Sequence, residues 1–210
     1  MKHLIALVLS IYSCWANGAE TFPTIEAYLE RATGKPNAAL AWDAASHSSP
    51  PGKRVFGIVR GEQMATVVIL DEQPGGEVRE VASSKPFAFF DPKDRMKVES
   101  VEAQSDKRFS IQIGFQNVCS TPFTFDLYRF TRIGQSWYVS GLDSTRCLWG
   151  DEGEAGGDSR MERSSNFLTG KVIERKFRKN MLVSERSKKT PFPQFPLAEF
   201  VPFDERHGPR

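Results

Sequence analysis

The chain has 210 residues, a length typical of one domain, and hydrophobic and charged residues make up 40% and 26% of it. Its 28 basic and 26 acidic residues leave a net charge of only +2, which argues against a dedicated nucleic-acid binder and against an acidic disordered chain. The 16 phenylalanines favour a core rich in β-sheet, because flat aromatic side chains pack well on pleated surfaces.

The first 19 residues have the layout of a secretory signal peptide. A short positive start precedes the apolar run Leu4–Ile11, and small residues follow up to Ala19. The run is too short to span a bilayer, for which a helix needs about 20 residues. We therefore predict a periplasmic or secreted protein whose mature chain begins near Glu20. Two alternatives stay open: a retained anchor, and lipidation of Cys14, which ends a segment that loosely resembles a bacterial lipobox.

Near the mature N-terminus, apolar residues recur on one helical face over residues 25–32 and predict an amphipathic helix. Thr24 can cap the start of this helix, and Gly34 ends it. The Ala-rich segment 36–45 is predicted as a second short helix.

From Arg54 onward the pattern changes to strands. Segments 54–60 and 64–71 flank a turn and are predicted as a hairpin. Residues 66–70 are continuously apolar and rich in β-branched side chains, which indicates a strand covered on both faces. Further strands are predicted over 78–82, 86–90 and 96–103.

The clearest strand pattern lies over residues 109–115, where apolar and polar side chains alternate. Segments 123–132 and 136–142 follow it, and the three together predict an antiparallel meander. In the middle segment the apolar phase switches between Leu127 and Tyr128, which indicates a bulge or two covered faces.

The mature chain holds two cysteines, Cys119 and Cys147. An even count in an exported protein predicts a disulfide bond, with two buried free thiols as the alternative. In the predicted meander the middle strand would hold the outer two roughly 9–10 Å apart, whereas a disulfide needs Cα atoms within about 7 Å. The connecting loops must then fold inward, or the strand order must differ. A zinc site is disfavoured, because His47 and His207 lie at no ligand spacing from a cysteine.

The C-terminal part of the chain contains three distinct segments. Residues 150–158 include four acids and four glycines and predict a loop. Segments 165–177 and 181–183 are predicted as a strand hairpin. From Thr190 to Phe203 four prolines interleave with four phenylalanines, which predicts an extended tail. The tail is predicted to wrap the body and insert its Phe rings into surface grooves, with a partner-binding peptide as the alternative.

These elements predict an α+β, β-dominated fold: a twisted antiparallel meander with an N-terminal helix and an extended Phe/Pro-rich C-terminal tail. We divide the chain into a signal peptide (1–19), a single β-rich globular domain (20–189) and the tail (190–210).

Most catalytic sequence patterns are absent, including the dinucleotide fingerprint, the P-loop and the H-E-x-x-H metalloprotease motif. Two weaker arrangements stay open. Asp43 lies four residues before His47 and would orient it as a base. Alternatively, acids such as Asp126, Asp143 and Glu174 would converge in space. We predict no catalytic residue, no metal site and no cofactor.

Two charged segments are candidate surfaces for partners. The acidic loop offers oxygen ligands, but Gly153 and Ala155 occupy positions where a calcium loop needs acids or amides, so a solvated loop is favoured. Segment 171–189 holds eight basic and two acidic residues. It predicts either a surface for an anionic partner, such as lipid headgroups, a cell-wall polymer or an acidic protein, or a solvated face whose lysines protect an edge strand. The acidic residues are Asp151, Glu152, Glu154 and Asp158, and the basic residues are Lys171, Arg175, Lys176, Arg178, Lys179, Arg186, Lys188 and Lys189.

Three segments, Tyr128–Phe130, Trp137–Asp143 and Asn166–Lys171, together resemble a pattern found in uncharacterised exported bacterial proteins. The resemblance extends over residues 128–171, about a fifth of the chain. It implies a location in the bacterial envelope and a curved, β-rich body, and it implies no activity.

Together the sequence favours a non-enzymatic exported protein of the bacterial envelope, of a binding or inhibitor/immunity type. The alternative is a periplasmic hydrolase that acts on a cell-wall or other envelope substrate through clustered carboxylates or His47. The expected partner is a protein or an envelope polymer, with no nucleic acid and no transmembrane span in the mature chain.

Overall fold

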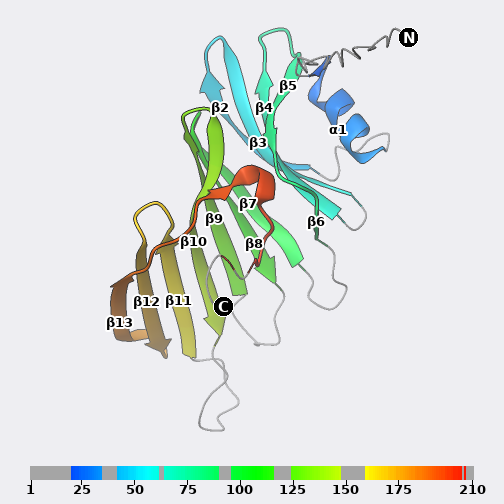
Figure 1. The fold of residues 1–210 in the computed structure, drawn as a ribbon. Coiled ribbons are helices and arrows are strands. Elements are labelled where there is room, and N and C mark those ends of the chain that lie inside the picture. The colour runs from blue at the N-terminus through cyan, green and yellow to red at the C-terminus, as the bar shows by residue number, and fades with distance from the viewer. Residues whose placement is uncertain are drawn as a thin grey trace, which may run out of the picture.

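The computed structural model describes residues 20–34, 42–61, 64–89, 96–115, 124–147, 159–204 and 206. Over these residues the chain forms two antiparallel β-sheets and one α-helix (Figure 1). The prediction of a β-dominated chain with antiparallel pairing is thereby confirmed.

The first sheet has the strand order β1-β5-β4-β3-β2, with β6 paired to β4. Its bounds are β1 (Thr21–Phe22), β2 (Trp42–Ser49), β3 (Gly52–Arg60), β4 (Met64–Glu72), β5 (Val78–Ser83) and β6 (Phe87–Ala88). Strands β3 and β4 form the predicted hairpin. Strand β4 is covered on both faces as expected, because Val67 and Val68 belong to different hydrophobic clusters.

The helix α1 (Ile25–Thr33) packs on the face of the first sheet that is turned away from the second sheet. Thr24 caps its start, accepting a hydrogen bond from the backbone N–H of Ala27, and Gly34 ends it in a left-handed conformation. Tyr28 and Leu29 are its buried residues.

The second sheet runs in chain order from β7 to β13, and β14 adds to it by pairing with β10. Its bounds are β7 (Met96–Ser105), β8 (Arg108–Phe115), β9 (Thr124–Ile133), β10 (Ser136–Cys147), β11 (Ser159–Asn166), β12 (Lys171–Arg178), β13 (Met181–Lys189) and β14 (Phe195–Pro196). The predicted meander corresponds to β8, β9 and β10, which pair antiparallel with β9 in the middle. Figure 1 shows β11–β13 at the end of this sheet that is farthest from α1 and the first sheet.

The main core lies between the two sheets and is built on stacked aromatic rings. Phe109 stacks between Phe56 of β3 and Phe130 of β9, with ring centroids 4.6 and 4.5 Å away. Trp137 meets both Phe56 and Phe109 edge-on. These contacts join side chains of both sheets, so the sheets form one hydrophobic core.

The Phe/Pro segment after β13 runs back across the second sheet toward the core (Figure 1). It includes β14 and a short 3₁₀ helix, Leu197–Glu199. Phe195 and Phe200 are buried, and the ring of Phe200 meets Tyr128 and Phe130 edge-on at 5.1 Å. The tail therefore supplies core side chains that neither sheet provides.

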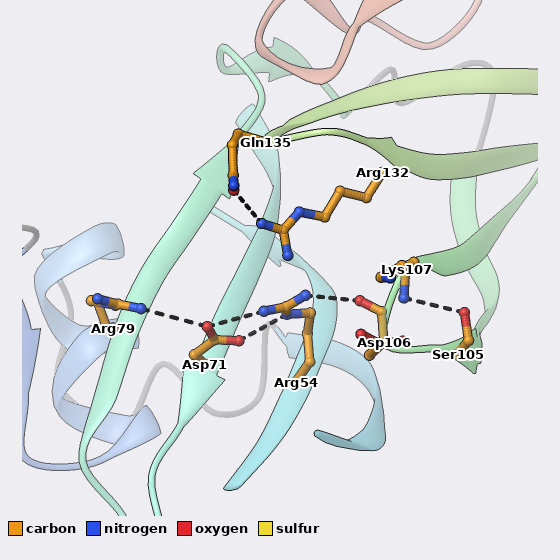
Figure 2. A network of polar contacts seen from close by, with 8 residues as sticks. All are labelled: Arg54, Asp71, Arg79, Ser105, Asp106, Lys107, Arg132 and Gln135. Atoms are coloured by element: carbon orange, nitrogen blue, oxygen red, sulfur yellow. Dashed lines mark hydrogen bonds and ion pairs between the residues drawn. The ribbon is translucent and has the colours of Figure 1, made fainter. Parts of the chain in front are cut away.

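A buried arginine connects the two sheets through the turn between β7 and β8 (Figure 2). The guanidinium of Arg54 on β3 donates to both carboxylate oxygens of Asp71 on β4, at 2.8 and 3.1 Å. Its third contact is a hydrogen bond of 2.9 Å to the backbone carbonyl of Asp106 in that turn. Arg79 on β5 lies 3.7 Å from the same Asp71 carboxylate.

The prediction of a helix over 36–45 is wrong where the structure describes it. Residues 42–49 form strand β2, and residues 35–41 lie outside the described part. Strand β2 pairs along its whole length with β3, from Trp42 opposite Val59 to Ser49 opposite Gly52. Sheet pairing overrides the helical preference of the alanines, because local propensity is weaker than tertiary contacts.

A single strand over 165–177 is also wrong, because the chain turns between β11 and β12. The side-chain carboxamide oxygen of Asn166 accepts hydrogen bonds from the backbone N–H groups of Leu168 and Thr169, at 3.1 and 3.0 Å. Gly170 completes the turn with a positive φ of 76°. Of the two explanations offered for the phase switch near Leu127, a bulge or two covered faces, the bulge is not on β9: the register shift lies on β10, between Val139 and Gly141.

Candidate binding face

The register of the second sheet assigns its residues to two faces, because directly opposite residues on antiparallel strands share a face. One row crosses β8–β12 through Ile111, Tyr128, Leu142, Ser165 and Val172, all of them buried. We call the face that holds this row the inner face, and the opposite one the outer face.

The inner face changes from apolar to charged beyond this row. The next row runs from Ile113 on β8 to Arg186 on β13, and the following one from Arg146 on β10 to Ser184 on β13. These two rows, together with Arg178 and Lys188, hold six basic and two acidic side chains on the inner face. We call this group of eight side chains the inner basic face. They are Arg146, Arg163, Lys176, Arg178, Arg186 and Lys188, with Asp126 and Glu174.

Ion pairs neutralise only part of the inner basic face. Arg146 lies 2.7 Å from the buried Asp126 carboxylate. Glu174 lies 3.3 Å from Lys188 and 4.0 Å from Arg163. Within the described part of the chain, no acidic side chain lies at ion-pair distance from the other three cations, Lys176, Arg178 and Arg186.

Tyr128 and Asp126 mark the border between the core and the inner basic face. The Tyr128 hydroxyl donates to Asp126 at 3.1 Å and accepts from the backbone N–H of Phe203 in the tail at 2.8 Å. Burial raises the pKa of Tyr128 well above its usual range, and the negative charge of Asp126 raises that pKa further. This network fixes the tail along the edge of the charged region.

The eight basic residues predicted from the sequence lie on the β12–β13 hairpin but do not form one patch. Arg175 on the outer face pairs with Glu185 at 2.7 Å, and Lys179 occupies the turn. The inner face holds Lys176, Arg178, Arg186 and Lys188, whereas the outer face holds Lys171, Arg175 and Lys189.

Two cations of the inner basic face were not predicted, Arg146 on β10 and Arg163 on β11. Both lie outside the basic segment, and strand β11 has a polar sequence without the apolar alternation that marks a strand. Only the pairing of β11 with β10 and β12 places these side chains beside the hairpin.

Several predicted residues lie outside the described part of the chain. These include Cys14 with the signal segment, Cys119, the side chain of Cys147, and His207. The acidic residues Asp151, Glu152, Glu154 and Asp158 are also outside it. The disulfide and the acidic loop therefore stay predictions.

The structure does not bring together the residues that hydrolysis would need. Asp43 and His47 are four residues apart on strand β2, which separates them by about 13 Å, and Asp43 pairs with Arg60 at 2.8 Å. Asp126 and Glu174 share the inner face but are three strands apart, about 14 Å. Asp143 lies on the outer face, where it pairs with Arg129.

A hollow of about 460 Å³ lies on the outer face, over β7–β10 and the β11–β12 turn. Glu102 is the carboxylate among its described lining residues, and His47 is not among them. Its floor is occupied by side chains that bond to one another: Gln104 donates to Ser110 at 2.7 Å, and Arg129 pairs with Asp143. Among the described residues that line it, the hollow thus has no pair of acids and no histidine.

Comparisons with protein families, curated proteins and solved structures find no match for this chain. Within the described residues there is no group of three metal-ligating side chains. No helix in that part of the chain is long and apolar enough to cross a membrane.

Proposed function

We propose that the protein is a non-enzymatic binding protein of the bacterial envelope, and that its inner basic face binds an anionic partner. The observation that carries the proposal is the excess of six cations over two acids on one face of β9–β13. Like charges held side by side on a sheet destabilise it, so their gathering on one face favours a role in binding.

The location of this face also supports the proposal. Strands β11–β13 extend away from the first sheet (Figure 1). The inner side chains Lys176, Arg186 and Lys188 are exposed. An anionic surface can therefore approach the cations without any rearrangement of the core. The envelope location rests on the signal-peptide pattern and on the resemblance to exported bacterial proteins.

The test compares two triple variants of the full chain that lose the same charge from the two faces of one hairpin. K176Q/R186Q/K188Q alters the inner face, and K171Q/R175Q/K189Q alters the outer face. Each variant also breaks one ion pair, that of Lys188 with Glu174 or that of Arg175 with Glu185. The matched pair thus separates the effect of the face from the effect of net charge.

We expect the unmodified chain to bind dextran sulfate, with an affinity that falls as salt is added. The inner variant should bind about tenfold more weakly or worse at low ionic strength, and the outer variant within about threefold of the unmodified chain. The proposal of an inner binding face would be refuted if both variants lost the same affinity for dextran sulfate, or if the unmodified chain did not bind it.

A further inference from the structure

We propose that the anionic partner is the surface of a lipid bilayer, and that the turn end of the β12–β13 hairpin inserts into its headgroup region. The inference rests on the proposed function, since it names the partner of the inner basic face. It is carried by three exposed apolar residues next to the turn: Met181 (66% exposed), Leu182 (52%) and Val183 (59%).

The turn of the hairpin contacts β11 through Arg160, which donates a hydrogen bond to the side chain of Asn180 at 2.6 Å, while the apolar residues next to the turn stay exposed. Strand β13 ends at Lys189, and the next residue, Thr190, donates its backbone N–H to Gly170 in the β11–β12 turn. The tail therefore leaves from the opposite end of the hairpin, about 25 Å from the turn at Lys179 and Asn180. Both turn residues have positive φ, as a tight two-residue turn requires.

The apolar side chains lie on both faces of the hairpin. Met181 is opposite Arg178 on the inner face, whereas Leu182 is opposite Phe177 on the outer face. The guanidinium of Arg160 covers the ring of Phe177 at 4.1 Å, which places a cation beside the apolar residues on that face too. A groove on a partner protein would cover only one face of the hairpin, whereas lipid would surround an inserted hairpin on all sides. Apolar residues on both faces therefore favour lipid over a groove.

The cations are placed to meet lipid phosphates while the apolar residues insert. Arg178 and Lys179 adjoin Met181, and Lys176 lies two residues further from the turn, about 7 Å along the strand. Apolar side chains of interfacial elements reach about 5–10 Å into the boundary of headgroups and acyl chains. Long basic side chains at that depth extend to the phosphates with their charged ends.

A second copy of the chain fits the edge of β13 less well than lipid does. Antiparallel pairing of β13 with itself about Glu185 would place Met181 opposite Lys189 and Leu182 opposite Lys188. Met181 and Leu182 would then face lysines, and Val183 would face Ser187. Lysines on an edge strand also oppose such pairing.

The test measures sedimentation of the full chain with vesicles of phosphatidylglycerol and phosphatidylcholine, and with pure phosphatidylcholine vesicles. The tip variant M181S/L182S/V183S removes the apolar residues and keeps every charge. The control variant M64S/I133S/L168S removes three exposed apolar side chains from other places on the surface.

We expect binding to the anionic vesicles alone, weakened about tenfold or more in the tip variant and by less than twofold in the control. The tip variant should still bind dextran sulfate like the unmodified chain. As a second measurement, tryptophan emission of L182W should shift to shorter wavelength when anionic vesicles are added, beyond any shift of the unmodified chain.

The outcomes separate the two proposals. Binding to dextran sulfate without binding to anionic vesicles would overturn the bilayer and leave the inner basic face in place. The bilayer proposal would also be overturned if the tip variant bound anionic vesicles as well as the unmodified chain does. It would be overturned as well if the unmodified chain did not bind vesicles and instead formed a dimer that the tip variant could not form. Failure of both ligands would overturn the proposed function itself.

Discussion

Single buried polar residues determine how the apolar and charged parts of this protein meet. Tyr128 belongs to the core through its ring, which meets Phe200 edge-on, and to the border of the inner basic face through its hydroxyl. A buried hydroxyl needs hydrogen-bond partners, and here Asp126 and the backbone of Phe203 provide them. The side chain of Tyr128 thus links strand β9, the Asp126–Arg146 ion pair and the tail.

At this scale we predict how stability depends on alkaline pH. Because the pKa of Tyr128 is raised in the folded chain, the folded chain keeps this proton above about pH 10 while the unfolded chain loses it. The free energy of unfolding should therefore fall above about pH 10, by about 1.4 kcal/mol per pH unit from this group. Urea unfolding of the unmodified chain and of Tyr128→Phe between pH 8 and pH 11 measures this.

The Tyr128→Phe variant should be less stable at pH 8, because it leaves Asp126 and the Phe203 N–H without the hydroxyl. Its stability should also fall less steeply above about pH 10 than that of the unmodified chain. If the free energy of unfolding fell equally steeply with pH in the two proteins, Tyr128 would not be the source of this pH dependence. Tyr28, whose pKa burial and Glu80 also raise, contributes equally to both profiles.

At the scale of elements, the tail completes the core rather than extending freely from it. Phe195 and Phe200 are buried among side chains of both sheets, although four prolines prevent this segment from forming a long strand or helix. Short pairing of β14 with β10 and one 3₁₀ turn suffice to position the rings. The tail is therefore part of the folded unit.

We predict that Phe200→Ala lowers the free energy of unfolding by about 3–4 kcal/mol, because it removes a buried ring and leaves a cavity. The neighbouring Glu199→Ala should change it by less than about 0.5 kcal/mol, since Glu199 is exposed. Denaturant unfolding of the two variants provides the comparison. If the tail lay on the surface without contributing to the core, both variants would lower the free energy of unfolding by a similar, small amount.

For the whole molecule, the near-neutral net charge conceals a separation of charge between regions. The described core is almost free of ionised groups, and the excess of cations gathers on the inner face of β10–β13. The buried charged residues of the described part are Asp126, which pairs with Arg146, and Arg54, whose guanidinium ties β3 and β4 to the turn of the second sheet. This contact helps to set how the two sheets are joined.

We predict that Arg54→Ala lowers the free energy of unfolding by about 3 kcal/mol, because the partly buried Asp71 carboxylate loses its main partner. Lys53→Ala, at the preceding position, removes an exposed lysine from its pair with the partly buried Glu72 and should cost less, about 1 kcal/mol. Thermal or urea unfolding measures both. Equal effects would mean that Arg54 contributes no more than a surface charge.

The strands with strong alternation or continuous apolar character could be predicted from the sequence, as β3, β4 and β8–β10 show. Strand β11 could not, because its residues are polar and its place is decided by neighbours on both sides. The segment that forms β2 was predicted as a helix because its alanines favour one, and its pairing with β3 overrides that preference. The basic residues of the hairpin were predicted, whereas their division between two faces was not.

By itself, the sequence determined that this chain is β-dominated, and it identified the basic segment 171–189 and the Phe/Pro segment. These are local properties, because periodicity, composition and turn residues act over a few neighbouring positions. Only the tertiary structure decided that Arg146 and Arg163 join the hairpin, that Phe200 enters the core, and that Asp43 and His47 stay apart. Such facts depend on the register between distant strands, and a shift by one residue would move every side chain to the other face.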